Sequence, residues 1–125
     1  MPPDSAKARN FLAQAADALA QIPRLTSSTV QFNIAYDSAH DVGEAVLAAY
    51  GYRTGGGVGA HVAVGSFLAI VFDQPPSSEA AAGYDALRQV RHGLRYRPST
   101  AGASQAAAAT QTAATLLDAA QSLGI

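Results

Sequence analysis

The apolar residues of this chain recur at helical spacing from its first segment onward. The first apolar face steps by four and three positions, through Ala8, Leu12, Ala15, Leu19 and Ile22. Asp4 and Ser5 offer side chains that can cap a helix, and Pro23 would end it. The pattern therefore predicts a helix over residues 5–22, preceded by a proline-rich start in which residues 1–4 are disordered.

The second segment is apolar over more than half of a helical circumference. It begins at the capping run Thr26-Ser27-Ser28 and runs to the stop signal Tyr50-Gly51. Such a broad apolar surface predicts a helix at the centre of a bundle. Its one strongly polar strip has members at i, i+3, i+4 and i+7, namely Asp37, His40, Asp41 and Glu44.

A glycine-rich stretch separates this helix from the most apolar part of the chain. Residues 52–59 lack the Gly-Lys-Ser/Thr ending that a phosphate-binding P-loop requires, so they are interpreted as a connector. Residues 60–72 are apolar all round and would also suit a strand. The chain offers no other convincing strand to pair with them, so a short buried helix is predicted.

Two more helices complete the pattern. Pro98 restricts Arg97 to extended conformations, so the helix that follows the turn at residues 73–78 should end near Tyr96. After a loop at residues 99–103, small and apolar residues form a last seam, Ala106, Ala109, Ala113, Leu116, Ala120 and Leu123. The spacing leaves open whether the seam packs within this chain or on a second copy. The prediction is an all-α, antiparallel bundle of four to five helices in a single domain, residues 1–125.

Composition narrows the class of protein without naming a function. The chain has 125 residues, 49% of them hydrophobic, a net charge of −1 and no cysteine. A charge near zero argues against wholesale capture by nucleic acid or membrane, and the absence of cysteine excludes disulfides, thiolate metal sites and a cysteine nucleophile. No secretory signal or membrane-spanning run is found, so a soluble, cytoplasmic protein is predicted.

Basic residues are concentrated in one helix. Four of the eight Lys and Arg residues lie between Leu87 and Arg97, a stretch without any acid. On a helix, Arg88, Arg91 and Arg95 form a column beside an apolar stripe. Cations spaced three and four apart repel each other, so the column should face an anion.

Two partners for the arginine column are weighed, and they do not exclude each other. A phosphate would suit guanidinium groups, which offer fixed and bidentate donors. The acidic strip of the second helix offers carboxylates instead, from Asp37, Asp41 and Glu44. Internal carboxylates could also hold the arginines in place for a ligand.

The remaining ionisable residues give weaker signals. The acidic strip could be half of a metal site, but the carboxylate-x-x-His spacing occurs there only once, from Asp37 to His40, so a solvated or salt-bridged face is the default and no metal or cofactor is predicted. His61 is interpreted as a helix-start hydrogen-bonding residue. His92 is the candidate base, because neighbouring arginines would lower its pKa and favour a neutral imidazole.

Several segments together resemble the HEPN superfamily of small bacterial α-helical bundles. They are an alanine-rich first helix, the segment Ala35-Tyr36-Asp37-Ser38-Ala39, the loop ending Gly59-Ala60-His61, and the late helix Leu87 to Tyr96. The resemblance implies a homodimer whose facing late helices form a cleft. It also implies that active members cleave RNA without metal, using an Arg followed by four to six residues and a His. Many are toxins paired with a nucleotidyltransferase-like antitoxin, and others are non-catalytic.

The chain departs from that nuclease motif. The positions where His92 would need an arginine hold Asp85, Ala86 and Leu87, and the pairing from Arg88 to His92 is one residue too short. Carried over by the resemblance, Arg91 is the phosphate-binding arginine and Tyr96 occupies the catalytic position, where a phenol with a pKa near 10 is a poor base.

Three functional hypotheses follow. The first is RNA or nucleotide-phosphate binding without nuclease activity, through Arg88, Arg91 and Arg95 with His92 and Tyr96 beside them. The second is a divergent metal-independent endoribonuclease toxin acting through Arg88 and His92. The third is a non-catalytic structural or interaction bundle, in which the acidic strip neutralises the column and the alanine seam mediates assembly.

Overall fold

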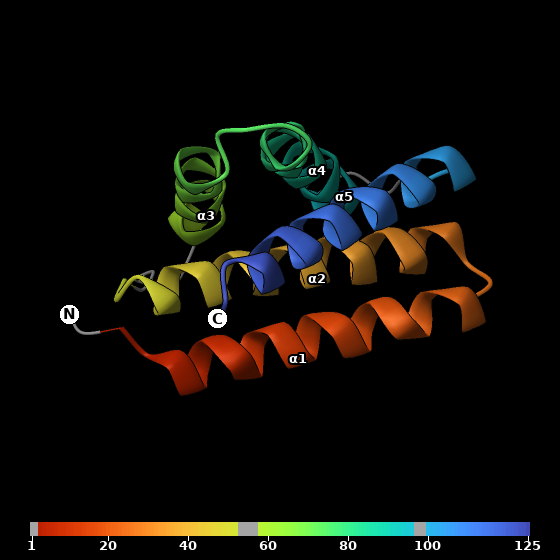
Figure 1. The fold of residues 1–125 in the computed structure, drawn as a ribbon. Coiled ribbons are helices and arrows are strands. Elements are labelled where there is room, and N and C mark those ends of the chain that lie inside the picture. The colour runs from red at the N-terminus through yellow and green to blue at the C-terminus, as the bar shows by residue number, and fades with distance from the viewer. Residues whose placement is uncertain (1–2, 53–57, 97–99) are drawn as a thin grey trace.

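A computed structural model describes residues 3–52, 58–96 and 100–125, except for the side chains of Val58, Arg95 and Tyr96. The glycine-rich residues 53–57 and Arg97 thus lie outside the described residues. The elements in chain order are α1 (Ser5–Gln21), the short 3₁₀ helix η1 (Ile22–Arg24), α2 (Ser28–Ala49), α3 (Val58–Val71), α4 (Ser77–Tyr96) and α5 (Ala103–Ser122) (Figure 1). The described ranges hold no strand, so the predicted all-α class is confirmed.

Helix α1 begins and ends where its capping residues predict. Asp4 accepts a hydrogen bond from the backbone N–H of Lys7 at 2.9 Å, and Pro23 lies in the 3₁₀ turn that follows the last α-helical residue. The backbone N–H of Asp4 also donates to the carbonyl of Ala48 at 2.9 Å. The disorder predicted for residues 1–4 therefore does not extend to Asp4, because this bond ties it to the end of α2.

Helix α2 is the centre of the fold, as its broad apolar surface predicts. It contacts each of α1, α3, α4 and α5, and its buried residues occur from Phe32 to Ala48. Gly51, with a φ of 82°, ends the helix in the left-handed conformation that glycine tolerates, and the N–H of Tyr52 returns to the carbonyl of Leu47 at 2.8 Å.

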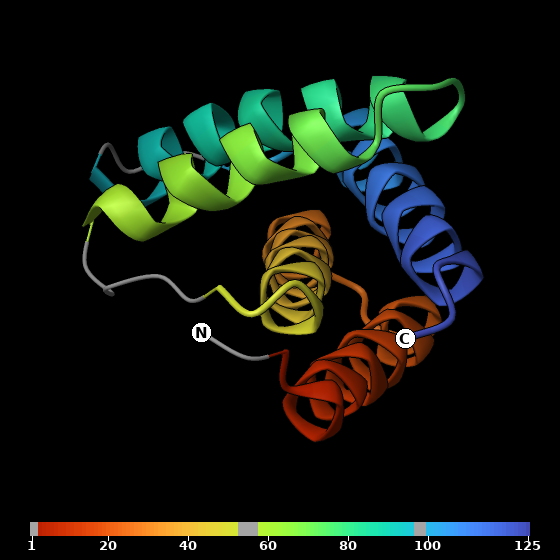
Figure 2. The same ribbon diagram turned by 60° about the vertical axis from the view of Figure 1, so that its left-hand side comes forward.

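The helices form two sets that cross each other. Helices α1, α2 and α5 lie side by side, and the chain reverses direction between α1 and α2 (Figure 1). Helices α3 and α4 form a hairpin that runs across α2, as the turned view shows (Figure 2). The crossing means that α4 meets α2 over a short length only, which decides which polar residues of the two helices can touch.

The prediction that residues 60–72 form a buried helix is right about the helix and wrong about its burial. Helix α3 packs on α2 and α4 only, so one stripe is covered, formed by Ala60, Val64, Leu68 and Phe72. The opposite face is open, with Val62 46% and Ile70 73% exposed. Within the part of the chain that is described, no helix is long and apolar enough to cross a bilayer.

The alanine seam of α5 finds its partner within the same chain. Its buried residues are Ala106, Ala109, Ala113, Leu116 and Ala120, and they pack mainly against α2. Small side chains let the two helices approach closely. Leu123, predicted to continue the seam, follows the last helical residue and is 43% exposed.

Candidate functional site

Arg91 connects the arginine column to the acidic strip. Its Nη1 donates to Asp37 Oδ1 at 2.8 Å and to the backbone carbonyl of Asn33 at 3.4 Å. Its Cζ also lies 5.3 Å from the centre of the Tyr36 ring, within cation–π range. Of the two partners weighed for the column, the acidic strip is therefore the one that Arg91 meets in this structure.

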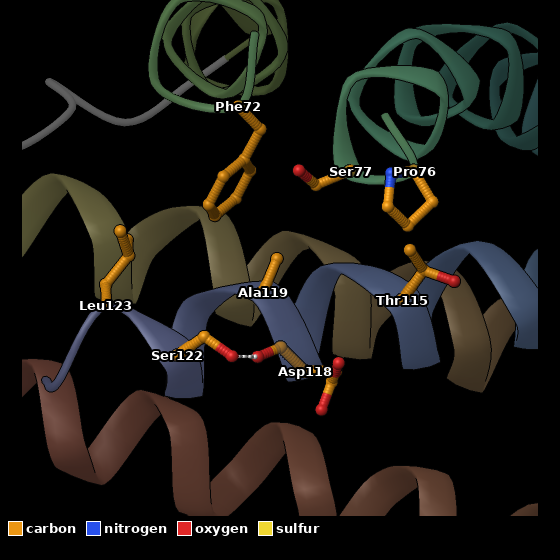
Figure 3. Close-up of a pocket in the computed structure, with 8 residues that line it drawn as sticks. All are labelled: Phe72, Pro76, Ser77, Thr115, Asp118, Ala119, Ser122 and Leu123. Carbon is orange, nitrogen blue, oxygen red and sulfur yellow. Dashed lines mark hydrogen bonds between the residues drawn. The ribbon is translucent and has the colours of Figure 1, made fainter. Parts of the chain in front are cut away.

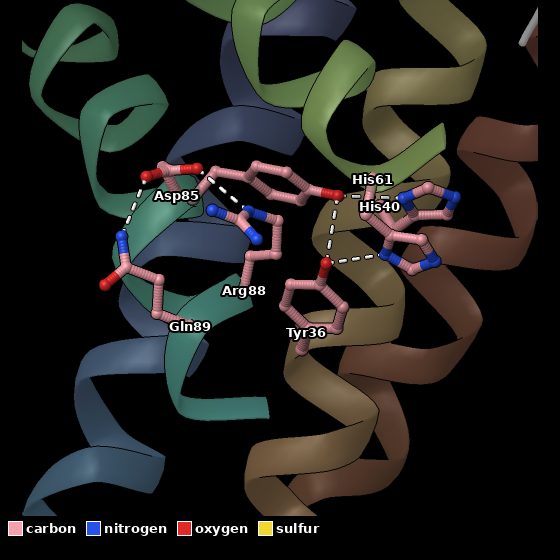
Figure 4. Close-up of polar contacts among 7 residues, drawn as sticks. Tyr36, His40, His61, Asp85, Arg88 and Gln89 are labelled. Carbon is pink, nitrogen blue, oxygen red and sulfur yellow. Dashed lines mark hydrogen bonds and ion pairs between the residues drawn. The ribbon is translucent and has the colours of Figure 1, made fainter. Parts of the chain in front are cut away.

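Arg88 has a different partner from the one predicted. Its Nε donates to Asp85 Oδ1 at 2.9 Å within α4, and Gln89 donates to the other oxygen of Asp85 at 3.1 Å (Figure 4). Glu44 faces His40 instead, with Oε1 3.4 Å from Nε2. The predicted match of three arginines with Asp37, Asp41 and Glu44 is thus wrong for Arg88, because the two helices cross rather than run alongside each other.

Within the described part of the chain, the ion pairs of Arg88 and Arg91 leave other guanidinium donors without a partner. A guanidinium has five N–H groups, and the contacts above involve one nitrogen of Arg88 and one of Arg91. The side chains of Arg88 and Arg91 are 28% and 20% exposed, and their carboxylate partners are about half exposed. Ion pairs this open contribute about 0–1 kcal/mol, so they orient the arginines more than they stabilise the fold.

Behind the arginines lies a cluster of four rings from three helices, here called the Tyr–His cluster: Tyr36 and His40 of α2, His61 of α3 and Tyr84 of α4. The hydroxyl of Tyr36 lies 2.6 Å from His61 Nδ1 and 3.2 Å from the hydroxyl of Tyr84. The Tyr84 hydroxyl lies 2.9 Å from His40 Nδ1 (Figure 4). These contacts form one continuous polar chain between the helices.

The rings of the Tyr–His cluster are also stacked. His40 and His61 have centroids 4.1 Å apart, and Tyr36 lies 5.7 Å from His61 and 5.4 Å from Tyr84, with planes within 20° of parallel in each pair. Tyr36 and Tyr84 are fully buried, whereas His61 is only partly buried. The cluster thus reaches from the core to the surface at His61.

Two glycines allow the helices to come close enough to form the cluster. A Cβ on Gly43 of α2 would overlap Val64 Cγ1 of α3, and a Cβ on Gly65 would come within 3.1 Å of the Tyr84 ring. A Cβ at Gly43 would force Val64 or its helix to shift, and one at Gly65 would require the Tyr84 ring to give by a few tenths of an ångström. The small residues therefore position His61 against Tyr36 and His40.

Burial keeps the histidines of the cluster neutral. It lowers the pKa of His40 to about 4, and the nearby His61 and Arg91 act in the same direction. It also lowers the pKa of His61, as do the positive charges of Arg91 and Arg88. Burial raises the pKa of both Tyr36 and Tyr84. Near pH 7 the cluster thus consists of two neutral imidazoles and two protonated phenols.

The acidic strip adds one more perturbed group. Burial, together with the charges of Asp37 and Glu44, raises the pKa of Asp41 to about 6. Among the described residues, no group of three or more His, Asp or Glu side chains is arranged to hold a metal ion.

The remaining predicted site residues lie on α4. His92 is exposed there, and the side chains of Arg95 and Tyr96 are outside the described part of the structure. The sequence pattern indicated no site role for Tyr36 or Tyr84 and placed His61 only at the start of its helix. The spacing from Tyr36 to His40, one helical turn, was the only local signal for the cluster.

A shallow cleft elsewhere on the surface holds none of these residues. It has a volume of about 320 Å³ and is lined by Phe72, Pro76, Ser77, Thr115, Asp118, Ala119, Ser122 and Leu123 (Figure 3). Asp118 is the one ionisable side chain of this lining. The cleft therefore brings together no group of residues that could act as acid, base or cation.

No protein-family model, no curated protein and no solved structure matches this chain. The fold and the site define its class, an all-helical bundle with a buried Tyr–His cluster beside two oriented arginines.

Proposed function

We propose that this chain is a HEPN-like bundle that binds RNA or nucleotide phosphates at the surface where Arg91 and Arg88 meet the Tyr–His cluster. The observation that carries the proposal is the setting of Arg91. Asp37 and the carbonyl of Asn33 hold one end of its guanidinium, and the Tyr36 ring supports its face. Its other donors meet no acceptor among the described residues. An arginine held this way can meet a phosphate without losing much side-chain freedom.

The ion pairs determine how a phosphate would bind. Asp37 and Asp85 are about half exposed, so their pairs with arginine are weak. A phosphate oxygen accepting charge-assisted hydrogen bonds from the unused donors would share each arginine with its carboxylate. With a net charge of −1 on the whole chain, binding would depend on this local site rather than on general attraction.

The test is binding of a labelled single-stranded RNA, measured by fluorescence anisotropy over a series of salt concentrations. Arg91→Ala should weaken binding by about tenfold or more, and the slope of log affinity against log salt should become shallower by about one unit. Arg24→Ala, which removes the same charge from exposed η1, is the matched control and should change neither. Thermal unfolding followed by circular dichroism should show both variants folded. Absence of RNA binding by the unmodified protein, or equal binding by Arg91→Ala, would overturn the proposal.

A second candidate function, a structural or interaction bundle, is favoured by the same two ion pairs. In that case Asp37 and Asp85 neutralise the column, and no anion from outside is needed. Asp37→Asn separates the two functions. Phosphate binding predicts that the RNA affinity of Asp37→Asn stays close to that of the unmodified protein, because an amide oxygen can still accept from Arg91. A purely structural pair predicts no RNA binding in either form.

The other parts of the family resemblance remain predictions. They are assembly as a homodimer, pairing with a nucleotidyltransferase-like antitoxin, and ribonuclease activity through Arg88 and His92. Incubation with total RNA in the presence of EDTA tests the activity, which His92→Ala should abolish if that pair is responsible.

A further inference from the structure

The outer face of α3 carries no charge along its whole described length. Its exposed residues are Gly59, Val62, Ala63, Ser66, Ala69 and Ile70, and Ser66 has the one polar side chain among them. Each of the other α-helices has an exposed charged or amide side chain, namely Lys7 in α1, Asp37 in α2, Glu79 in α4 and Gln111 in α5. A continuous exposed apolar face of this kind marks a surface that another molecule covers.

Two tyrosines widen this surface at one edge. Tyr50 and Tyr52 follow the end of α2, and their ring centroids lie 5.7 and 5.5 Å from that of Phe67 in α3. Together with Val62 and Ile70, they are four of the six large apolar residues that are exposed in the described part of the chain. The exposed apolar surface is therefore concentrated on and beside α3, which lies at the outside of the bundle (Figure 2).

The exposed residues of α3 are arranged symmetrically about Ser66. Val62 and Ile70 lie four positions before and after it, and Ala63 and Ala69 lie three positions before and after it. In a pair of antiparallel helices, residues at equal distances on opposite sides of a common centre face each other. Two copies of α3 centred on Ser66 thus place Val62 of one copy against Ile70 of the other. The alanines meet in the same way, so large side chains pack on large ones and small on small.

The charges at the two ends of α3 favour the antiparallel arrangement. The helix has no acidic residue in its first turn, and the exposed Asp73 lies two positions beyond its last residue, Val71. The N-terminus of a helix carries a partial positive charge and the C-terminus a partial negative one. In an antiparallel pair, Asp73 of each copy therefore lies toward the positive end of the other copy's α3. A parallel pair would instead bring like ends together.

We propose that the exposed face of α3 is a docking surface for a second copy of this chain, with the two α3 helices packed antiparallel across a two-fold axis at Ser66. Such an interface uses the same patch on both copies, which a face complementary to itself allows. The surface differs from the late-helix cleft that the family resemblance implies. The proposal is independent of RNA binding, because it uses neither Arg88 nor Arg91.

The size of the face sets the strength of the association. Helix α3 has 14 residues and is about 21 Å long. One face of such a helix buries on the order of 400 Å² per partner, about half of what a stable interface buries. The dimer is therefore expected to dissociate in the micromolar range, and the chain should be a monomer when more dilute.

Disulfide cross-linking tests the two-fold axis, because the chain has no cysteine of its own. Facing Cα atoms of two packed helices lie within about 6 Å of each other, a separation that a disulfide spans. Ser66→Cys should therefore give a covalent dimer on mild oxidation, seen on a non-reducing gel. Gln111→Cys on the exposed face of α5 is the matched control and should stay monomeric. Linkage of Ser66→Cys no greater than that of the control would overturn the proposal.

Two further cysteine variants test the direction of the helices. In the antiparallel pair, the two copies of Val62 are offset by about 12 Å along the helices, and so are the two copies of Ile70. Val62→Cys and Ile70→Cys should thus stay largely monomeric when oxidised separately and should cross-link to each other when mixed. Each variant linking to itself but not to the other would indicate a parallel pair and contradict the proposed arrangement.

Sedimentation equilibrium of the unmodified protein measures the association without any substitution. Between about 10 and 500 µM, the average mass should rise from that of a monomer toward that of a dimer. Circular dichroism should show all the cysteine variants folded, because each replaces an exposed residue. A monomer over the whole range of concentrations would overturn the proposal and leave the α3 face to a different protein.

Discussion

The imidazole rings of His40 and His61 stack with their centroids 4.1 Å apart and their planes 16° from parallel, although they belong to different helices. Two imidazolium charges at this distance would repel each other, and both rings lose hydration where they lie. Burial lowers the pKa of both rings; the charge of His61 lowers the pKa of His40 further, and the charges of Arg91 and Arg88 lower that of His61, so the stack is a neutral one near pH 7. The stability of the bundle should therefore depend on pH in a way that its individual residues make predictable.

Asp41 should destabilise the folded protein at neutral pH. Its pKa is raised to about 6, so the folded chain holds a proton that the unfolded chain releases between about pH 4 and 6, and stability falls as pH rises through that window. Asp41→Asn should raise the free energy of unfolding at pH 7 by on the order of 1 kcal/mol, allowing for solvent screening, with a smaller gain near pH 4. Urea unfolding at both pH values measures the difference. An equal gain at both would mean that ionisation of Asp41 is not the cause.

His40 should act in the opposite sense over the same range. Its pKa is lowered to about 4 in the folded chain. Below about pH 6.5 the unfolded chain therefore binds a proton at His40 that the folded chain does not bind. The free energy of unfolding then decreases as pH falls toward 4. The effects of Asp41 and His40 on the pH dependence of stability partly cancel in the unmodified protein. Asp41→Asn should therefore lose stability more steeply on acidification than the unmodified protein does, and adding His40→Gln should flatten that slope. If stability depends on pH as steeply in the double variant as in Asp41→Asn alone, protonation of His40 is not the cause of that dependence.

Gly43 and Gly93 should respond oppositely to the same substitution. A Cβ on Gly43 would overlap Val64, whereas a Cβ on Gly93 would meet nothing within 4 Å. Gly43→Ala should thus destabilise the fold by about 1–3 kcal/mol through overpacking, and Gly93→Ala should stabilise it by about 0.5–1 kcal/mol through helix propensity. Val64→Ala combined with Gly43→Ala should recover part of the loss. Chemical denaturation of the four proteins provides the comparison.

A substitution on the exposed face of α3 tests the assembly of the protein separately from the stability of a single chain. Ile70 is 73% exposed, so Ile70→Lys should change the free energy of unfolding by no more than about 0.5 kcal/mol. Leu68 on the covered face is the control, and Leu68→Ala should cost about 2–5 kcal/mol. Sedimentation of the unmodified protein and of Ile70→Lys measures whether each is a monomer or a dimer. If the chain forms a dimer that Ile70→Lys dissociates, this face is the interface, and the predicted dimerisation through the late helices is wrong.

The sequence by itself determined the elements that depend on neighbours within a turn or two. Helix ends follow from Asp4 and Gly51, and the buried stripe of α5 follows from its spacing, because capping and periodicity are local properties of the chain. Within the arginine column the sequence indicated that an anion should lie nearby, and the Arg91–Asp37 pair is such a contact.

Only the tertiary structure decided what those elements bring together. Tyr36 is 25 residues from His61 and 48 from Tyr84, and no local pattern relates positions so far apart. Their meeting depends on the angle at which the α3–α4 hairpin crosses α2 and on the close approach that Gly43 and Gly65 allow. The same crossing leaves one face of α3 uncovered, because a hairpin lying across a helix buries only the stripe that faces it.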